Sequence, residues 1–367
     1  WLRGDAGVTT SSGSVTDWFD QSGNGNDITQ GTATNQPTLT TGSINGVDVV
    51  TFDGSDDFLV DGDGTYLNGE SGVTAMVVVE ANATGSDAGI LDTGPTANFG
   101  DNEDDVFSIR YDEEIFQVGT PNVFKFGLAA GGTTNQYQTE VTDDRVQTTD
   151  PQLITYRYEN GDGNPLVLLD GSTVGTSTAN TPSGTVSNMS QLALGEGSQG
   201  VTWDGDIAEV ILFGEGLNQA ERTVVHTYLA EKYNNWSGGG EVLSYDHIGN
   251  YFNDFSGIGQ ASDGTVRTDA QSAELQLTNP STLSDGDFVL FGHDNSSFAL
   301  TTSERPGGDP DAQKTEREWR VDLKGSTSQT VDVTVDLSSL SLPSGTNDYG
   351  IFVDADGDFT TGDPTFY

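Results

Sequence analysis

Acidic side chains at short, regular spacings are the residues of this sequence best suited to chemistry. Near the C-terminus, Asp354, Asp356 and Asp358 occupy alternate positions directly after a short apolar run, and Asp363 follows. Carboxylates at the first, third and fifth positions of a tight loop converge on one point, as in the calcium loop of an EF-hand. Here the glycine falls at the fourth place and not at the sixth, and Thr365 stands where that loop has glutamate. The sequence leaves two interpretations open, a calcium site and a plain acidic turn.

A second group of acidic residues follows a predicted strand. The strand begins at residue 46 and alternates its side chains between two faces, and five aspartates then occur within residues 53–63. This density of carboxylates is sufficient to bind a calcium ion, for which Asp53, Asp56 and Asp57 are the candidate ligands. The alternative is a solvent-exposed hairpin in which aspartate side chains accept hydrogen bonds from the backbone. Together, the two groups make calcium the expected cofactor.

Three other patterns are excluded by their context. Residues 195–200 match G-x-G-x-x-G, but a further strand follows where a dinucleotide site needs a helix, and Glu196 would repel a pyrophosphate. His226, His247 and His293 lack the spacing of a zinc site. The sequence contains no G-x-S-x-G elbow for a serine nucleophile.

One loop offers candidate ligand-binding residues. An apolar sugar face stacks on an aromatic ring, while the sugar hydroxyls pair with polar groups. The segment 135–144 contains both kinds of side chain close together. We therefore name Tyr137 and Asn135 as the candidate ligand-binding residues.

The charge balance restricts the partners of this chain. Its 367 residues include 57 acidic and 13 basic ones, which gives a net charge of −44 at pH 7. A field of this sign repels nucleic acid and anionic membranes, so we expect no nucleic acid partner. The carboxylates have three interpretations: cation binding, a solvated surface adapted to high salt, and solubility of an extracellular protein. No apolar run is long enough to span a bilayer, so no membrane insertion is expected.

The elements that position these residues are mostly strands. Only 33% of the residues are hydrophobic, and 48 glycines separate short apolar runs, as in a loop-rich all-β protein. Residues 206–213 predict a strand, and a helix is predicted to begin at Asn218, which caps it together with Glu221. The apolar residues that recur at helical spacing on one face of this helix are Ala220, Val224, Tyr228 and Leu229.

Three stretches of the first two thirds of the chain carry a family resemblance. They are W-x-D-x-S-G-N-G-N-D at 18–27, F-D-G-x-D-D-F at 52–58, and 205–233, which runs from G-D-I-A-E-V to Y-L-x-x-K-Y. These stretches resemble the laminin-G-like, concanavalin-A-like β-sandwich modules of bacterial surface proteins. The resemblance implies an antiparallel sandwich with one C-terminal helix over residues 1–236. It also implies an adhesive, lectin-like role at the bacterial cell surface.

The pattern changes after a glycine-rich join at residues 237–240. Beyond the join, V-D-V-T-V-D-L at 331–337 alternates as a half-buried antiparallel strand does. The stretches S-D-G-D-F-V-L-F-G-H-D at 284–294 and R-E-W-R-V at 317–321 carry a second resemblance. This part resembles an uncharacterised β-domain that follows such modules in bacterial surface proteins. We expect residues 237–367 to form a second, smaller β-sandwich domain that is incomplete at its C-terminus.

The resemblance raises the question of catalysis, because concanavalin-A-like sandwiches include retaining glycosidases with the spacing E-x-D-x-x-E on one strand. Asp204, Asp206 and Glu209 have this spacing, with aspartate at the first place. Retaining chemistry needs two carboxyl groups about 5 Å apart. In an unbroken strand Asp204 and Asp206 share a face and Glu209 lies on the other, so a bulge would be needed to bring it round. We expect no catalytic residue and no enzymatic activity.

These observations predict a non-enzymatic extracellular binding or adhesion module of a bacterial surface protein. The module would be lectin-like and stabilised by calcium, and its partner would be a glycan or another cell-surface ligand. One alternative is a structural repeat subunit of a surface appendage or filament, whose partners are copies of the same chain. A third is a retaining glycoside hydrolase of the concanavalin-A-like class.

Overall fold

The computed structural model describes most of the chain. The described residues are all except 84–87, 95–106, 113–122, 132–138, 142–147, 179–180, 198–200, 234–235, 237–239, 246–250, 304–312, 326–328, 343–344, 346–349 and 355–364. The chain divides into two compact units: unit 1 comprises Trp1–Asn218 and Leu229–Val242, and unit 2 comprises Gln219–Tyr228 and Leu243–Tyr367. The domain boundary predicted at residue 236 falls inside the second segment of unit 1.

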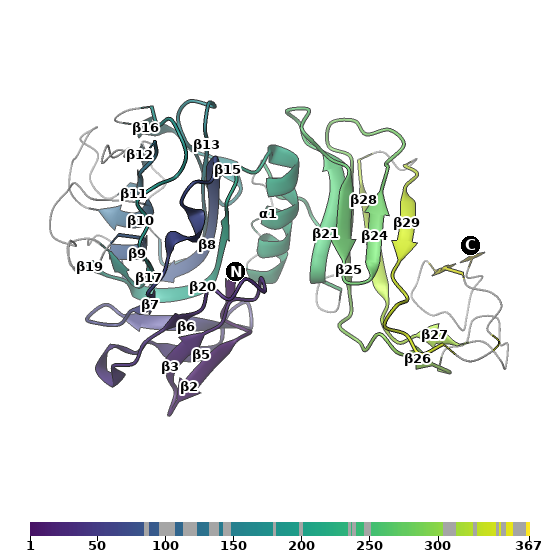
Figure 1. The fold of residues 1–367 in the computed structure, drawn as a ribbon, viewed down its shortest axis with the longest axis horizontal. Coiled ribbons are helices and arrows are strands. Elements are labelled where there is room, and N and C mark those ends of the chain that lie inside the picture. Colours follow the sequence, from purple (N-terminus) through teal and green to yellow (C-terminus); the bar gives the residue numbers. More distant parts are fainter. Residues whose placement is uncertain are drawn as a thin grey trace. The chain divides into compact units, whose positions relative to one another are not determined.

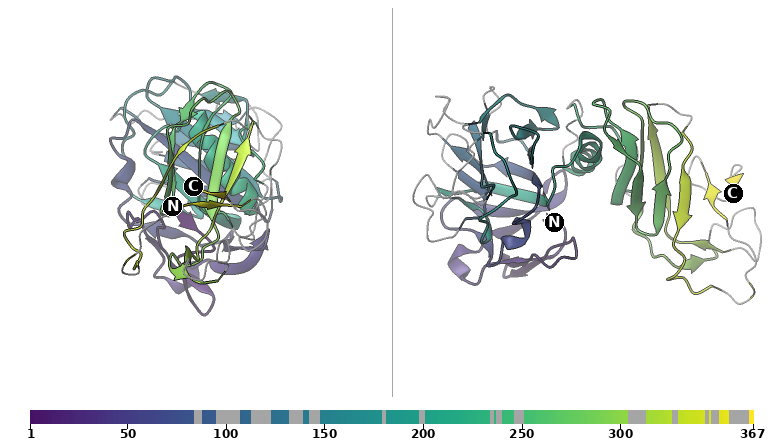
Figure 2. Two further views of the ribbon diagram at one scale, coloured as in Figure 1. Left: turned by 90° about the vertical axis from the view of Figure 1, so that its right-hand side faces the viewer. Right: turned by 45° about the horizontal axis from the view of Figure 1, so that its top comes forward.

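Unit 1 is an antiparallel β-sandwich, whose two layers can be followed in Figures 1 and 2. The first layer contains, in order, β15 (Ser172–Thr173), β14 (Leu166–Leu169), β13 (Gln152–Glu159), β8 (Gly72–Ala81), β20 (Asp204–Phe213), β6 (Val47–Asp53), β5 (Thr38–Ile44) and β3 (Ser14–Trp18). The second layer contains, in order, β7 (Leu59–Asp61), β17 (Leu192–Leu194), β9 (Ala88–Asp92), β10 (Phe107–Asp112), β11 (Val123–Leu128), β12 (Thr139–Val141) and β16 (Thr176–Thr178).

The two layers belong to one continuous sheet. The short strand β4 (Ile28–Thr29) pairs with β3 in the first layer and with β7 in the second, and so connects them. Three further antiparallel pairs are β1 (Leu2–Arg3) with β20, β2 (Val8–Ser11) with β3, and β18 (Glu196–Gly197) with β19 (Val201–Thr202).

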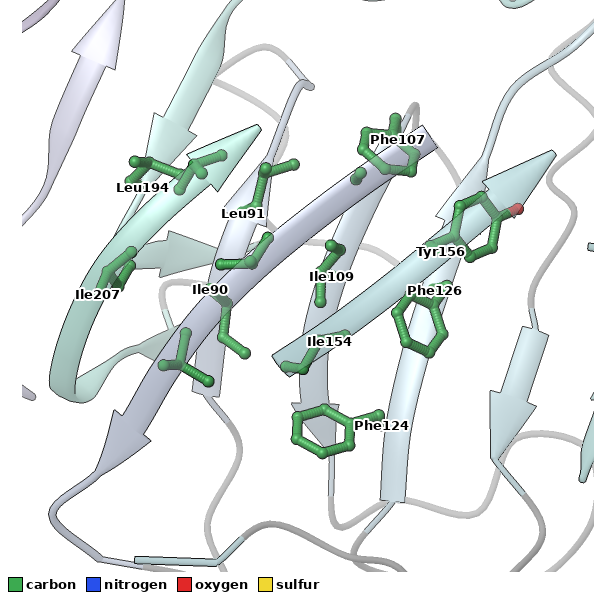
Figure 3. Close-up of a cluster of buried hydrophobic side chains, with 14 of the residues drawn as sticks. Ile90, Leu91, Phe107, Ile109, Phe124, Phe126, Ile154, Tyr156, Leu194 and Ile207 are labelled. Carbon is green, nitrogen blue, oxygen red and sulfur yellow. The ribbon is translucent and has the colours of Figure 1, made fainter. Parts of the chain in front are cut away.

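The hydrophobic core of unit 1 lies between the layers (Figure 3). Tyr156 of β13 packs against Phe126 of β11 and Phe107 of β10, with ring centroids 5.2 and 5.5 Å apart. Strand β8 has a nearly continuous apolar sequence, which is typical of a strand buried on both faces. The prediction is confirmed, because every residue from Val73 to Val79 is buried. The predicted fold class, all-β with one helix, is confirmed for the described residues.

One α-helix is present in the described part of the chain. Helix α1 (Gln219–Tyr233) begins directly after the predicted cap, Asn218. Two 3-10 turns, η1 (Ala33–Asn35) and η2 (Thr65–Leu67), are the other helical elements described. Within the described residues, no helix combines the length and the hydropathy needed to cross a membrane.

The apolar face predicted for helix α1 is buried at all four positions. The first ten residues of the helix belong to unit 2, where Ala220 and Val224 pack with Tyr245 and Leu290. The last five residues belong to unit 1, where the hydroxyl of Tyr233 lies against β20. Both parts of the helix therefore contribute buried side chains to the unit to which they belong.

Unit 2 is a smaller β-sandwich. Its four-stranded sheet contains β22 (Val266–Arg267), β21 (Asn253–Gln260), β25 (Phe288–His293) and β28 (Trp319–Lys324), and its three-stranded sheet contains β23 (Asp269–Ser272), β24 (Leu275–Thr278) and β29 (Asp332–Val335). Two further pairs are β26 (Leu300–Thr301) with β27 (Lys314–Thr315), and β30 (Phe352–Val353) with β31 (Thr365–Phe366). A small core that includes Ile258, Leu277 and Phe291 lies between the two larger sheets.

Candidate functional site

Three of the predicted calcium ligands converge in the loop that follows β6. Asp53 ends β6, and Asp56 and Asp57 lie in the turn before β7. One carboxylate oxygen from each of the three residues lies within 4.8 Å of the others. Asp53 and Asp56 are exposed, whereas Asp57 is only 7% exposed. Such an arrangement can surround a cation with oxygen ligands on one side and leave the other side to water.

Hydrogen bonds attach this loop to Thr202 and Trp203, which directly precede β20. Gly54 adopts a φ of +73°, its N–H donates to Trp203 O (3.1 Å), and its carbonyl accepts from Thr202 Oγ1 (2.7 Å). A Cβ atom at Gly54 would lie 2.7 Å from the Cβ of Asp204, so no other residue fits without a shift. This accounts for the glycine of the F-D-G-x-D-D-F stretch.

The carboxylates of the loop are electrostatically crowded. Burial raises the pKa of the Asp57 carboxyl, the hydrogen bond from the Asp53 N–H (3.1 Å) opposes this, and the charges of Asp53 and Asp56 raise it further. The Ser55 N–H donates to Asp53 Oδ1 (2.8 Å), so the backbone turn of the alternative interpretation is present as well. The turn and a cation site are compatible, because these hydrogen bonds use one oxygen of Asp53 and one of Asp57.

Most of the other predicted calcium ligands and ligand-binding residues lie outside the described residues. Asp354 directly follows β30, but Asp356, Asp358 and Asp363 lie outside the described residues. Tyr137 and Asn135, the predicted ligand-binding residues, also lie outside them.

Strand β20 contains a β-bulge, so the predicted placement of Glu209 is wrong. Ile207 and Glu209 pair with consecutive residues of β8, which makes Ala208 an extra residue in β20. The bulge reverses the alternation of side chains, and Ile207 and Val210 both belong to the core between the layers. Glu209 therefore shares the outer face of the strand with Asp206.

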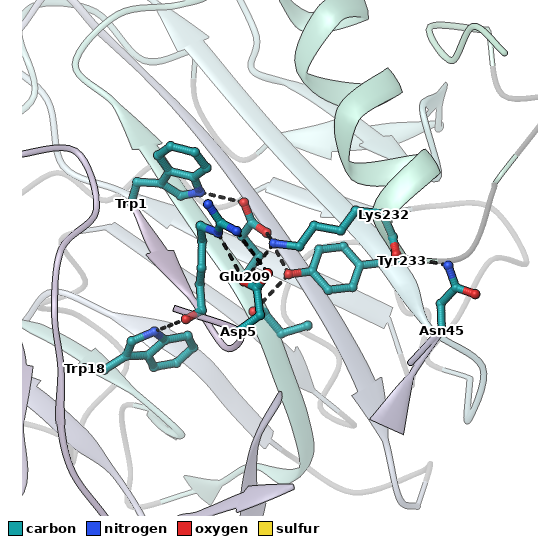
Figure 4. A network of polar contacts seen from close by, with 9 residues as sticks. Trp1, Asp5, Trp18, Asn45, Glu209, Lys232 and Tyr233 are labelled. Carbon is teal, nitrogen blue, oxygen red and sulfur yellow. Dashed lines mark hydrogen bonds and ion pairs between the residues drawn. The ribbon is translucent and has the colours of Figure 1, made fainter. Parts of the chain in front are cut away.

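Glu209 is fully buried in a polar network (Figure 4). Its carboxylate accepts hydrogen bonds from Trp1 Nε1 (2.5 Å), Tyr233 Oη (2.6 Å) and Lys232 Nζ (2.8 Å). Lys232 Nζ also contacts Asp5 Oδ1 at 2.9 Å. The G-D-I-A-E-V and K-Y stretches thus meet in one buried ion pair, through which the end of α1 is held against β20.

Asp206 is also held by neighbouring strands. Its two oxygens accept from Thr51 Oγ1 (2.6 Å) and Ser43 Oγ (2.8 Å). Both oxygens of Asp206 and both oxygens of Glu209 are therefore bonded to donors of this chain. The carboxylates of β20 are arranged as structural contacts.

A row of charged side chains that the sequence analysis missed crosses the second layer. Arg110 of β10 lies opposite Lys125 of β11, and Lys125 lies opposite Glu140 of β12. The adjacent residues Ile109 and Phe126 belong to the core, so the row occupies the outer face of this layer. Its signal in the sequence is Lys125, one of only four lysines, at the centre of the apolar run 123–128.

The charged row is buried. Glu140 is 1% exposed, and Arg110 and Lys125 are buried as well. Lys125 Nζ lies 4.0 Å from Glu140 Oε1, an atom without a hydrogen bond in the described part of the chain. Buried polar atoms normally have partners, because losing hydration without a replacement costs free energy. The row therefore places three buried charged side chains next to one another, one of which has an acceptor atom without a hydrogen bond.

Comparison with protein families gives a match in the C-terminal part. Residues 221–367 match the model of a domain of unknown function (DUF8202). The match covers less than half of the chain and most of unit 2. No curated protein sequence matches the chain.

Several solved structures have a similar fold at low identity. The native heptameric SAP-like pentraxin from Limulus polyphemus is 14% identical over 54% of this chain and 88% of its own, with a TM-score of 0.36. The Ruminococcus gnavus IT-sialidase CBM40 bound to alpha2,3 sialyllactose is 12% identical over 46% of this chain and 91% of its own, with a TM-score of 0.34. The binding domain of Botulinum neurotoxin DC in complex with rat synaptotagmin II is 11% identical over 75% of this chain and 68% of its own, with a TM-score of 0.40. At these scores the likeness supports no conclusion about function.

Proposed function

We propose that this chain is a non-enzymatic, lectin-like adhesion module of the bacterial cell surface, and that calcium stabilises its acidic loop. The observation that carries the proposal is the convergence of Asp53, Asp56 and Asp57 in a loop that hydrogen bonds attach to the residues directly before β20. Loops held by a rigid sandwich are the usual place for binding residues. The proposed ligand is a glycan displayed on a surface.

The reason for calcium is the crowding of the three carboxylates. Burial and then the nearby charges of Asp53 and Asp56 raise the pKa of Asp57, and each added negative charge within a few ångströms raises the free energy of the ionised loop. A divalent cation removes this repulsion, and calcium accepts the irregular oxygen geometry that three aspartates and water provide. Bound calcium would hold the turn between β6 and β7 in one conformation.

The proposed place for the glycan is the outer face of β10, β11 and β12, where binding requires the buried side chains of Glu140, Lys125 and Arg110 to become accessible. A sugar presents several hydroxyls, which can donate to Glu140 and accept from Arg110 and Lys125. Glu140 Oε1 lacks a hydrogen bond in the described residues, so a hydroxyl donor there would satisfy a buried acceptor.

We propose that the chain is not an enzyme because the carboxylates of β20 are already bonded within the chain. A retaining glycosidase presents two carboxyl groups to the scissile bond about 5 Å apart. Glu209 is instead 0% exposed and forms an ion pair with Lys232. We expect no release of reducing sugar from β-glucans, and a release that Asp206→Asn abolishes would contradict the proposal.

Calcium titration tests the metal site. After chelation, isothermal titration of the full chain should give heat for about one site in this loop, together with a rise in melting temperature. The variant Asp56→Asn/Asp57→Asn should lose both, and Asp63→Asn, an exposed aspartate of the next turn, should lose neither. If the double variant titrates like the wild type, the loop is not the site.

A glycan array with and without calcium tests the binding role. We expect the full chain to retain one class of glycan and to retain it more strongly with calcium. The variant Lys125→Met should reduce retention, whereas Lys314→Met, a lysine of unit 2, should leave it unchanged. No retention under either condition would remove the lectin-like role but leave the calcium titration to be judged separately.

A further inference from the structure

The unit 2 sandwich is open along one side. Strand β28 ends the four-stranded sheet and pairs with β25 alone among the described residues. Strand β29 ends the three-stranded sheet and likewise pairs with β24 alone within the described part of the chain. On the opposite side the two sheets are joined covalently, because only Thr268 separates β22 of the four-stranded sheet from β23 of the three-stranded sheet. An edge strand carries backbone donors and acceptors that can pair with another strand.

The open side exposes aliphatic side chains that face the inside of the sandwich. Val321 and Leu323 of β28 pair in register with Phe291 and Val289, which belong to the core between the sheets. Alternation therefore directs Val321 and Leu323 toward that core. Even so, Val321 is 48% exposed and Leu323 is 43% exposed.

The facing edge has the same property. Val333 of β29 pairs with Leu277, a core residue, so it also faces the inside, and it is 43% exposed. Inward-facing residues of a complete sandwich are covered by the opposite sheet. Three half-exposed aliphatic side chains along two adjacent edges indicate a core that lacks its last layer of contacts.

The two edges differ in charge. Strand β28 carries Arg320, Asp322 and Lys324, of which Asp322 and Lys324 pair with each other at 2.7 Å, and its net charge is +1 where the whole chain has −44. Residues 329–338, which include β29, carry Asp332 and Asp336 and no basic residue. An acidic strand with aliphatic residues at alternate positions is therefore complementary to β28, and β29 is such a strand.

We propose that this open side is a self-association surface, where two copies of the chain pair through a twofold axis. Strand β28 of each copy lies beside β29 of the other, so each four-stranded sheet continues into the partner's three-stranded sheet. The pairing satisfies both edges, covers Val321, Leu323 and Val333 of both copies, and places the basic strand next to the acidic one. A twofold contact is closed, because each copy supplies both halves of the interface.

The test measures the mass of the full chain by sedimentation equilibrium in 1 M sodium chloride. Salt at this concentration reduces the Debye length to about 3 Å and so screens the repulsion between two highly acidic copies. We expect a dimer. The variants Val321→Lys/Leu323→Lys and Val333→Lys, which change different strands, should each raise the dimer dissociation constant by about a hundredfold or more.

The control is Val266→Lys, which changes a residue with almost the same exposure, 45%, on the other edge of the four-stranded sheet. It should leave the dimer intact. Circular dichroism should be unchanged for all variants, because a lysine at a half-exposed position keeps its ammonium group in water. A monomer at all concentrations, or open chains of more than two copies, would overturn the proposal. The outcome is independent of calcium and glycan binding, because the surface lies within unit 2.

Discussion

Unit 1 contains one carboxylate that pairs with a lysine and a group of carboxylates whose charged neighbours are other carboxylates. Glu209 is fully buried, yet it lies 2.8 Å from Lys232 Nζ and accepts two further hydrogen bonds. Asp57 lies in the loop after β6, where the neighbouring charges belong to Asp53 and Asp56. The first group is paired with a lysine of the chain, and the second is the group for which we propose a bound calcium ion. Burial alone therefore does not distinguish a structural acid from a candidate ligand.

The largest expected effect comes from breaking the internal pair. Lys232→Met would remove the ammonium group that lies 2.8 Å from the buried Glu209 carboxylate, and breaking a buried ion pair typically costs about 3–5 kcal/mol. Chemical denaturation should show this loss in the free energy of unfolding. The double variant Lys232→Met/Glu209→Gln removes both charges and should recover part of the loss. If Lys232→Met unfolds like the wild type, the ion pair does not hold α1 against β20.

The parts of this arrangement that sequence could predict are local. Alternation and β-branched residues indicated the strand over 206–213, and the cap and apolar spacing indicated the helix from 218. The close spacing of Asp53, Asp56 and Asp57 was sufficient to identify an acidic turn, because residues so near in sequence cannot lie far apart.

The parts that sequence could not predict depend on distant partners. The bulge at Ala208 turns Glu209 toward Lys232, which lies on the helix that follows the strand. The sequence of β20 contains no pattern that predicts the extra residue. The row of Arg110, Lys125 and Glu140 likewise forms only when three strands pair in register. Strand register is set by the whole sandwich, so these contacts were visible only in the structure.

The second prediction concerns Glu140, which shares its burial with Glu209 but has a weaker contact with its lysine. It is buried like Glu209 and also faces a lysine, but the separation is 4.0 Å and Oε1 has no hydrogen bond in the described residues. Glu140→Gln should therefore change the free energy of unfolding by no more than about 1 kcal/mol, in contrast to the loss expected for Lys232→Met. The same variant should weaken glycan retention. A loss of stability as large as that of Lys232→Met would make the row structural and remove it as a ligand site.

The smallest effect concerns the pH dependence of the acidic loop. In the fold the pKa of Asp57 is raised above its ordinary value of 3.8, so the folded state holds this proton more tightly than the unfolded state does. The contribution of Asp57 to stability is therefore most favourable below pH 3.8 and is lost as the pH rises through the raised pKa. An asparagine side chain at this position would remain uncharged at every pH and could still accept the hydrogen bond from the Asp53 N–H.

Melting curves of the wild type and Asp57→Asn in a chelating buffer measure this difference. At pH 7 the variant should melt about 1–3 °C higher, since it lacks both the buried charge and its repulsion by Asp53 and Asp56, and the two curves should converge as the pH falls toward about 4. Calcium at pH 7 should raise the melting temperature of the wild type alone, because the variant has lost a ligand. A constant difference from about pH 4 to pH 7 would mean that the Asp57 charge is not the cause. In that case the difference between Asp57 and Glu209, whose charge is paired with Lys232, would lie in the position of the side chains and not in their electrostatic energy.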